Sequence, residues 1–121
     1  MPQISVDYSP GLEGSFDRRA LGLAINRLAV KTIDARPEAC KTLFRRTEDF
    51  VVGESTGADE QVYVEFQIFP GRAPEAKAAL GEAVQALLAE HVRPAPGGRL
   101  FTAVNISDID RDCYRSATIE G

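Results

Sequence analysis

Three segments of the chain alternate between apolar and polar residues, at positions 3–8, 62–68 and 100–106. A period of two sends successive side chains to opposite faces of a strand, so each segment is predicted to be a half-buried strand. A fourth strand, with a less regular pattern, is predicted over residues 39–46, with Cys40, Thr42 and Phe44 on one side.

Two further segments show helical spacing. The first is predicted to begin near Ser15, whose hydroxyl can accept a hydrogen bond from an early backbone N–H, and to continue to about residue 34. Pro37 follows it and disfavours helix at the residue before it. The second begins near Pro74, where a missing N–H costs nothing, and ends before Pro94. Its predicted apolar face consists of Ala76, Ala79, Leu80, Ala83, Val84, Leu87 and Leu88.

The connection between the second and third strands contains one more apolar run. Residues 50–53, Phe-Val-Val-Gly, are predicted to form a short strand or hairpin arm, and residues 53–60 a polar loop. The predicted order is then strand, helix, strand, small hairpin, strand, helix, strand. This order fits either two tandem βαβ units that share a sheet or a ferredoxin-like βαββαβ fold. Both pack two helices on one face of a four-stranded sheet, and we expect a partner subunit to cover the other face.

The composition of the chain excludes several kinds of chemistry. The 121 residues have a net charge of −4, with 44% apolar and 26% charged residues, which suits one globular domain over residues 1–121. A single His and two Cys provide no metal-ligand cluster, so no metal site is expected. The acidic balance argues against a nucleic-acid partner. Neither a signal peptide nor a membrane-spanning segment is expected, and the two cysteines are expected to be free thiols of a cytoplasmic protein.

Pro2 is the candidate catalytic residue. Cellular aminopeptidases remove an initiator Met before a small residue such as Pro, which would leave Pro2 with a free secondary amine. Burial and neighbouring cations both disfavour the charged form of such an amine, and a neutral amine is a base. A strand that begins at residue 3 would hold this base rigidly.

The residues around these features carry a family resemblance. The amino-terminal Pro2, the Phe50–Gly53 arm and the Gly71–Arg72 turn before the second helix resemble those of the tautomerase superfamily. More narrowly, residues 2 to 112 are similar to the 5-carboxymethyl-2-hydroxymuconate delta-isomerase family. The resemblance implies a pair of pseudo-symmetric βαβ units, with halves at about 2–54 and 61–110, that assemble as a homotrimer.

The resemblance also implies a reaction and a set of site residues. The amino-terminal proline of this superfamily moves a proton between atoms of an unsaturated 2-hydroxy or 2-oxo acid without a cofactor. Lys41 stands where the family typically has an arginine; it keeps the charge but lacks the bidentate fork that suits a carboxylate. Arg72 matches a turn arginine of related tautomerases, and Phe50 matches an aromatic wall of the pocket. Arg46 is a further candidate for binding the anionic substrate.

Three functional hypotheses follow from the sequence. The first is a cofactor-independent isomerase or tautomerase that acts on a small dicarboxylic or 2-oxo acid, with Pro2 as its general base. The second is an oligomeric ligand-binding or regulatory module of ferredoxin-like build, in which Pro2 has no chemical role. The third is a relative that keeps the tautomerase fold and has lost the activity.

Overall fold

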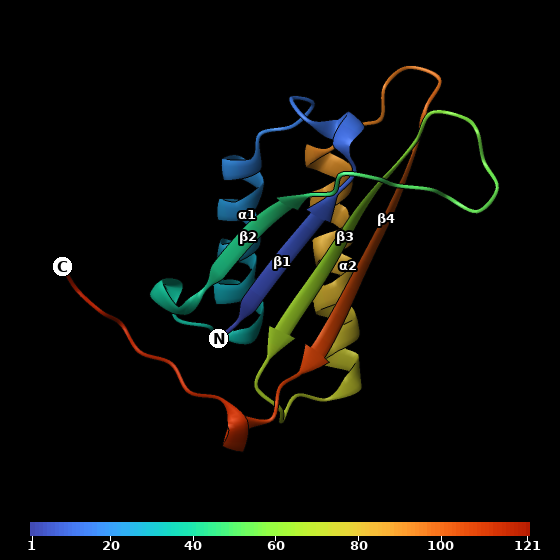
Figure 1. Cartoon of the computed structure of the whole chain (residues 1–121). Coiled ribbons are helices and arrows are strands. Elements are labelled where there is room, and N and C mark those ends of the chain that lie inside the picture. Colours follow the sequence, from blue (N-terminus) through green and yellow to red (C-terminus); the bar gives the residue numbers. More distant parts are fainter.

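A computed structural model describes residues 1–121 as a four-stranded sheet with two helices (Figure 1). Short 3-10 helices occupy the connections after the first strand and the first helix and the segment after the last strand. The helices and strands are β1 (Gln3–Tyr8), α1 (Arg18–Ile33), β2 (Lys41–Arg46), β3 (Asp59–Ile68), α2 (Pro74–His91) and β4 (Arg99–Asp108).

The strand order decides between the two architectures that the sequence allowed. The order across the sheet is β2-β1-β3-β4, with β1 parallel to β2, β3 parallel to β4, and the central pair β1 and β3 antiparallel. Each parallel pair is joined by the helix between its strands, so the chain consists of two tandem βαβ units. The ferredoxin-like alternative is wrong, because the helix of each half connects strands that lie side by side.

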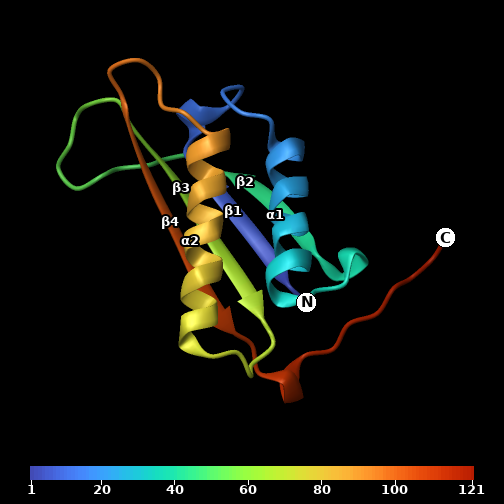
Figure 2. The same ribbon diagram turned by 180° about the vertical axis from the view of Figure 1, so that it is seen from behind.

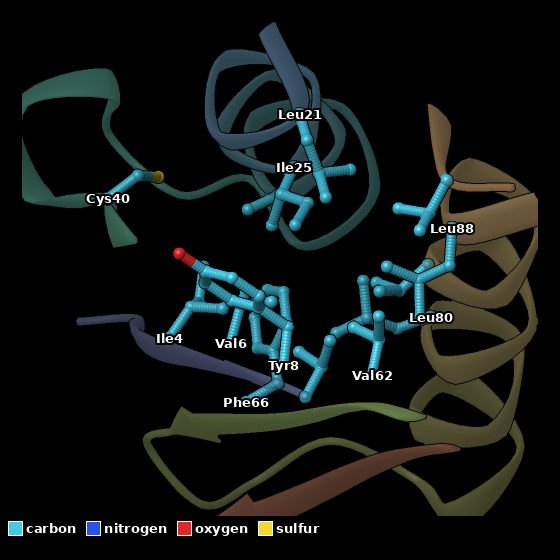
Figure 3. Close-up of a cluster of buried hydrophobic side chains, with 14 of the residues drawn as sticks. Ile4, Val6, Tyr8, Leu21, Ile25, Cys40, Val62, Phe66, Leu80 and Leu88 are labelled. Carbon is cyan, nitrogen blue, oxygen red and sulfur yellow. The ribbon is translucent and has the colours of Figure 1, made fainter. Parts of the chain in front are cut away.

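The core lies between the sheet and the two helices. Alternate residues of β1 and β3 point into it, as the period of two predicts. Figure 3 shows these side chains meeting those of the helices, with Phe66 beneath and Leu21 and Leu88 on the helix side. The fully or almost fully buried strand and helix residues are Ile4, Val6, Tyr8, Val62, Val64, Phe66, Ile68, Leu21, Ile25, Ala29, Leu80, Val84 and Leu88.

Both helices pack on the same face of the sheet, and the opposite face is open (Figure 2). Three large apolar side chains on this open face are partly exposed: Leu43 of β2, Tyr63 of β3 and Phe101 of β4. The layer arrangement of two helices on a four-stranded sheet is therefore as predicted. Nothing in the single chain covers the second face.

The start of α1 differs from the prediction. The helix begins at Arg18, and its N-cap is Asp17, whose carboxylate accepts a hydrogen bond from the Ala20 N–H at 2.9 Å. Ser15 is not the cap, because its hydroxyl donates instead to the Leu12 carbonyl at 2.6 Å. The helix ends at Ile33, and its C-cap, Asp34, adopts a left-handed conformation with φ 56°.

The connection between β2 and β3 is irregular. Residues 50–53 form no strand, so the predicted hairpin arm is wrong. Val51 is 79% exposed, which shows that the apolar run has no sheet to pack against within the chain. The segment leaves the end of β2 and projects past β4 before β3 begins (Figure 1).

Candidate active site

A cavity of about 470 Å³ opens at the end of the sheet where β1 begins. Its walls come from Met1 and Pro2, from the α1–β2 connection, from the β3–α2 turn and from the segment after β4. Pro2 itself is buried, and its carbonyl accepts a hydrogen bond from the Lys41 backbone N–H at 3.3 Å. This hydrogen bond fixes Pro2 at the start of the central strand β1, beside the first residue of β2.

Lys41 is the first residue of β2 and lies beside the start of β1, because Gln3 pairs with Lys41 in the parallel register. Its side chain is exposed and lines the cavity. Its Nζ donates to the Ala39 carbonyl at 3.3 Å and takes part in none of the ion pairs of the chain. The ammonium is therefore available to an anion that enters the cavity.

Arg72 lies in the turn between β3 and α2 and is half-buried. Its Nη2 donates to the Ile33 carbonyl at the end of α1 at 2.7 Å, and its Nη1 lies 3.5 Å from the Phe69 carbonyl. These carbonyls fix the guanidinium against the wall of the cavity. A guanidinium has five N–H donors, so donors remain for a ligand.

The cavity also contains acidic groups, which sequence reasoning did not consider. Asp34 and Glu38 both line it. Arg36, on the same wall, donates from Nε to Glu38 at 2.8 Å, and both side chains are mostly exposed. The pKa of Glu38 is lowered, first by a hydrogen bond from its own backbone and then by Arg36. Such an exposed pair contributes little to stability.

The electrostatic environment at the start of β1 favours a neutral amine. Burial lowers the pKa of the Met1 amino group, and the positive charge of Lys41 lowers it further. The nearby Cys40 thiol opposes this shift. Cys40 is buried, as expected for a small apolar residue, and burial raises its own pKa. An amine at this position therefore loses its proton more readily than an ordinary terminal amine.

The structure brings three of the five predicted site residues together and leaves two apart. Pro2, Lys41 and Arg72 line the same cavity. Arg46 pairs with Tyr8 at the far end of β1, five residues along the strand or about 16 Å from the Lys41 position. Phe50 lies beyond Arg46, in the projecting connection, and neither side chain lines this cavity.

Sequence reasoning missed the wall formed by the segment after β4. Tyr114, Ser116 and Thr118 line the cavity together with Phe69 of the β3–α2 turn. The tail has no apolar period, so its position could not be read from its pattern. Tyr114, the one aromatic residue of the tail, was the available signal.

No group of three or more His, Cys, Asp or Glu side chains is arranged so that it could hold a metal ion. Neither helix combines the length and the apolar character needed to cross a bilayer.

Comparisons with known proteins were made for both sequence and fold. A model of the 5-carboxymethyl-2-hydroxymuconate isomerase family matches residues 2–119. No curated protein sequence matches the chain. Among solved structures, a 5-carboxymethyl-2-hydroxymuconate isomerase from Deinococcus radiodurans R1 is similar, with a TM-score of 0.79 and 21% identity over 98% of this chain and 90% of that one.

Two other solved structures share the fold. One is described as a fused 4-OT wild-type symmetric trimer, with a TM-score of 0.74 and 22% identity over 96% of this chain and 92% of that one. The other is a 5-carboxymethyl-2-hydroxymuconate delta-isomerase, with a TM-score of 0.72 and 16% identity over 98% and 88% of the two chains.

The tandem βαβ fold and the family match together define an isomerase of the tautomerase type. More specifically, the chain belongs to the 5-carboxymethyl-2-hydroxymuconate isomerase family, whose model covers almost its whole length. The resemblance seen in the sequence is thereby confirmed.

Proposed function

We propose that this protein isomerises a small unsaturated 2-hydroxy or 2-oxo carboxylic acid of the 5-carboxymethyl-2-hydroxymuconate type, with the Pro2 amine as general base and no cofactor. The observation that carries the proposal is the position of Pro2: buried at the start of a central strand, on a cavity that also contains the unpaired Lys41 ammonium. Membership of an isomerase family supports the reaction class.

The base requires the removal of Met1. While Met1 is joined to Pro2, the Pro2 nitrogen is an amide nitrogen and is not basic. Both residues line the cavity, so cleavage of the Met1–Pro2 bond would leave a secondary amine facing the space that Met1 occupied. Because burial and Lys41 lower the pKa of the amine at this end of the chain, we expect them to favour the neutral, basic form of Pro2 as well.

The proposed reaction is a proton transfer that balances within the substrate. The neutral Pro2 amine accepts the proton of the 2-hydroxyl group, or of a carbon beside the 2-oxo group, and becomes a pyrrolidinium. The electrons that remain delocalise over the conjugated system and place negative charge on the 2-oxygen. The pyrrolidinium then returns the proton to another carbon, which moves the double bond and regenerates the base.

Lys41 and Arg72 are proposed to bind the negative charges of the substrate. Lys41 lies beside the base and has no carboxylate partner, so it is suited to the oxygen on which charge develops. Arg72 is fixed by the carbonyls of Ile33 and Phe69 and is suited to a substrate carboxylate.

The open face of the sheet supports a homotrimer, which we also propose. Leu43, Tyr63 and Phe101 lie on this face without cover, and a structural neighbour is described as a symmetric trimer. Arg46 and Phe50 are too far from Pro2 of their own chain, so their proposed role requires that they enter the site of an adjacent subunit. We place the enzyme in the cytoplasm, where its two cysteines would remain free thiols.

The test combines mass spectrometry with kinetics. The mass of the intact protein shows whether Met1 is removed, and a protein that retains Met1 would contradict the proposed base. With Met1 removed, the wild type should isomerise 2-hydroxymuconate far faster than the Pro2→Ala variant. Equal and low rates in both proteins would favour a family member that has lost the activity.

A further inference from the structure

The connection between α1 and β2 forms one wall of the cavity and lies beside the N-terminus (Figure 1). It contributes three charged side chains to the cavity, those of Asp34, Arg36 and Glu38. The proton transfer proposed above uses none of them. Arg36 is the one cation of this connection and stands between its two carboxylates in the sequence. Whether an anion can lie against this wall therefore depends on Arg36.

The backbone of Arg36 is fixed by the residues that follow it. Its carbonyl accepts hydrogen bonds from the Ala39 N–H at 3.0 Å and from the Cys40 thiol at 3.4 Å. Pro37 disfavours the helical region at the residue before it, and Arg36 is accordingly extended, with φ −74° and ψ 136°. The side chain of Arg36 thus starts from a defined point on the cavity wall.

The Arg36 guanidinium has donors that the chain does not use. Its Nε donates to Glu38 Oε1 at 2.8 Å, whereas Nη1 and Nη2 have no acceptor within the chain. The edge formed by two nitrogens of a guanidinium can bind a carboxylate through two parallel hydrogen bonds. The ion pair with Glu38 is mostly exposed and therefore weak, so it leaves Arg36 able to bind a second anion.

The number of cations in the cavity can be compared with the number of anionic groups on a substrate. Lys41 and Arg72 match the two ends of 2-hydroxymuconate, which are the 2-oxygen with its neighbouring carboxylate and the second carboxylate. 5-Carboxymethyl-2-hydroxymuconate, after which the family is named, has a third carboxylate on its carboxymethyl branch. Arg36 is the third cation that lines the cavity, whose volume of about 470 Å³ is in the range of small-molecule sites.

We infer that Arg36 determines substrate specificity: its Nη atoms bind the carboxylate of the carboxymethyl branch and so favour 5-carboxymethyl-2-hydroxymuconate over 2-hydroxymuconate. This inference rests on the proposed function and deepens it by assigning the third carboxylate of the substrate. Without the charge of Arg36, Asp34 and Glu38 would repel that carboxylate from the wall.

The effect of Arg36 is expected in KM. A CH₂ group separates the carboxylate of the branch from the conjugated double bonds, so this carboxylate has the same charge in the bound substrate and in the transition state. Arg36 therefore binds both states equally, and an interaction of this kind lowers KM without changing kcat.

Two substrates that differ only by the carboxymethyl group test the inference. Arg36→Ala should lower the ratio of kcat/KM for 5-carboxymethyl-2-hydroxymuconate to kcat/KM for 2-hydroxymuconate about fivefold, which is the upper end for a solvent-exposed ion pair. Arg36→Lys keeps the charge and should restore part of the ratio. The control is Arg19→Ala, which removes an exposed arginine of α1 that does not line the cavity and should leave the ratio unchanged. An unchanged ratio in Arg36→Ala would overturn the inference.

A substitution of Glu38 separates binding by Arg36 from a role in the structure of the wall. Glu38→Gln keeps an oxygen acceptor for Arg36 Nε and removes a negative charge beside the branch. KM for 5-carboxymethyl-2-hydroxymuconate should therefore fall about twofold, opposite to the change in Arg36→Ala. A rise in KM for both substrates in both variants would assign the Arg36–Glu38 pair to the structure of the connection and overturn the inference.

Binding to the Pro2→Ala variant separates this inference from the proposed chemistry. The probes are fumarate and trans-aconitate, which also differ by one carboxymethyl group. Calorimetry should show that trans-aconitate binds about fivefold more tightly than fumarate, and that the Pro2→Ala/Arg36→Ala variant loses this difference. A difference that depends on Arg36, together with a wild type that has no turnover, would retain the inference and overturn the catalytic proposal. Turnover in the wild type without such a difference would overturn the inference alone.

Discussion

The two ends of strand β1 differ in how their polar groups are satisfied. At the Tyr8 end, the Tyr8 hydroxyl donates to Glu13 Oε2 at 2.8 Å and accepts from Arg18 Nη1 at 3.0 Å, while Arg18 pairs with Glu13 at 3.1 Å. At the Pro2 end, the Lys41 ammonium has only a backbone carbonyl as partner.

The difference indicates which end has polar groups available to a ligand. A network whose donors and acceptors satisfy one another is stable and has little to offer a ligand. A cation that lacks a counter-charge beside a cavity gains more from an anionic substrate than from its own chain. If the proposed function holds, the same strand has a structural end and a reactive end, and we expect mutations to have different effects at the two.

The largest effect is expected from Pro2→Ala at the reactive end. General base catalysis typically contributes a factor of about 10² to 10⁴, and the primary amine of Ala is neither as rigid nor as well placed. We expect kcat for 2-hydroxymuconate to fall by about that factor, with an unchanged melting temperature as the control. A fall of less than about threefold would remove Pro2 from the mechanism.

Lys41→Ala should have the next largest effect. Loss of the charge beside the base should lower kcat/KM by about 10- to 100-fold, because a hydrogen bond to a charged group contributes about 1.5–3 kcal/mol. Lys41→Arg should restore most of it. The matched control is Arg45→Ala on the same face of β2, since Arg45 is paired with Asp7 away from the cavity.

The Lys41→Ala variant should also change the dependence of kcat/KM on pH. The base must be neutral, so activity should fall as the pH drops through the pKa of the Pro2 amine, which we expect burial and Lys41 to lower as they lower the pKa of the Met1 amine. Lys41→Ala removes one of these two causes, so the acidic limb should move to higher pH. Pre-steady-state or initial-rate profiles measure the shift, and an acidic limb that stays in place would argue against Lys41 as a neighbour of the base.

At the structural end, Tyr8→Phe should reduce stability and leave catalysis intact. The ring remains buried, while the hydroxyl that joins Glu13 and Arg18 is lost. We expect the free energy of unfolding in urea to fall by about 1 kcal/mol, the usual contribution of one hydrogen bond. A loss of turnover comparable to that of Lys41→Ala would contradict the separation of the two ends.

The smallest effect is expected from replacing Glu13 in this network, and it concerns the dependence of stability on pH. Hydrogen bonds from Tyr8 and then from Arg18 lower the pKa of Glu13 below the value of the unfolded chain. The unfolded state therefore takes up a proton first, and the stabilisation by Glu13 is present above its unfolded pKa and is lost as the pH falls through its folded pKa. Glu13→Gln should make acid unfolding less steep, as measured by circular dichroism between about pH 5 and 2.

Prediction from the sequence succeeded where a period was present. The alternation of Ile4, Val6 and Tyr8 and the helical stripe of Leu80, Val84 and Leu88 correspond to buried faces, because burial of one face of a regular element imposes its period on the sequence. The strand order was not accessible in this way, since both candidate folds contain the same elements.

Prediction failed where apolar residues lacked a partner within the chain. Phe50–Gly53 has the composition of a strand, but no strand of this chain lies beside it, so it remains irregular.

Prediction also failed where the outcome depends on contacts that the local pattern does not contain. Ser15 and Asp17 are both good N-cap residues, and the choice between them depends on the preceding turn, where the Leu12 carbonyl accepts from Ser15. The position of the segment after β4 depends on the contact of Tyr114 with Phe69, which is 45 residues earlier in the sequence.

The tandem arrangement of two βαβ units has an evolutionary consequence. A chain with two such units has a single amino terminus, so only β1 can begin next to a free amine, whereas the equivalent strand β3 begins at Asp59 inside a continuous backbone. If both units descend from one ancestral unit by duplication, the second unit was released from selection for chemistry at its first residue. It could then diverge toward other roles, such as carrying Arg72 and anchoring the carboxyl-terminal segment through Phe69.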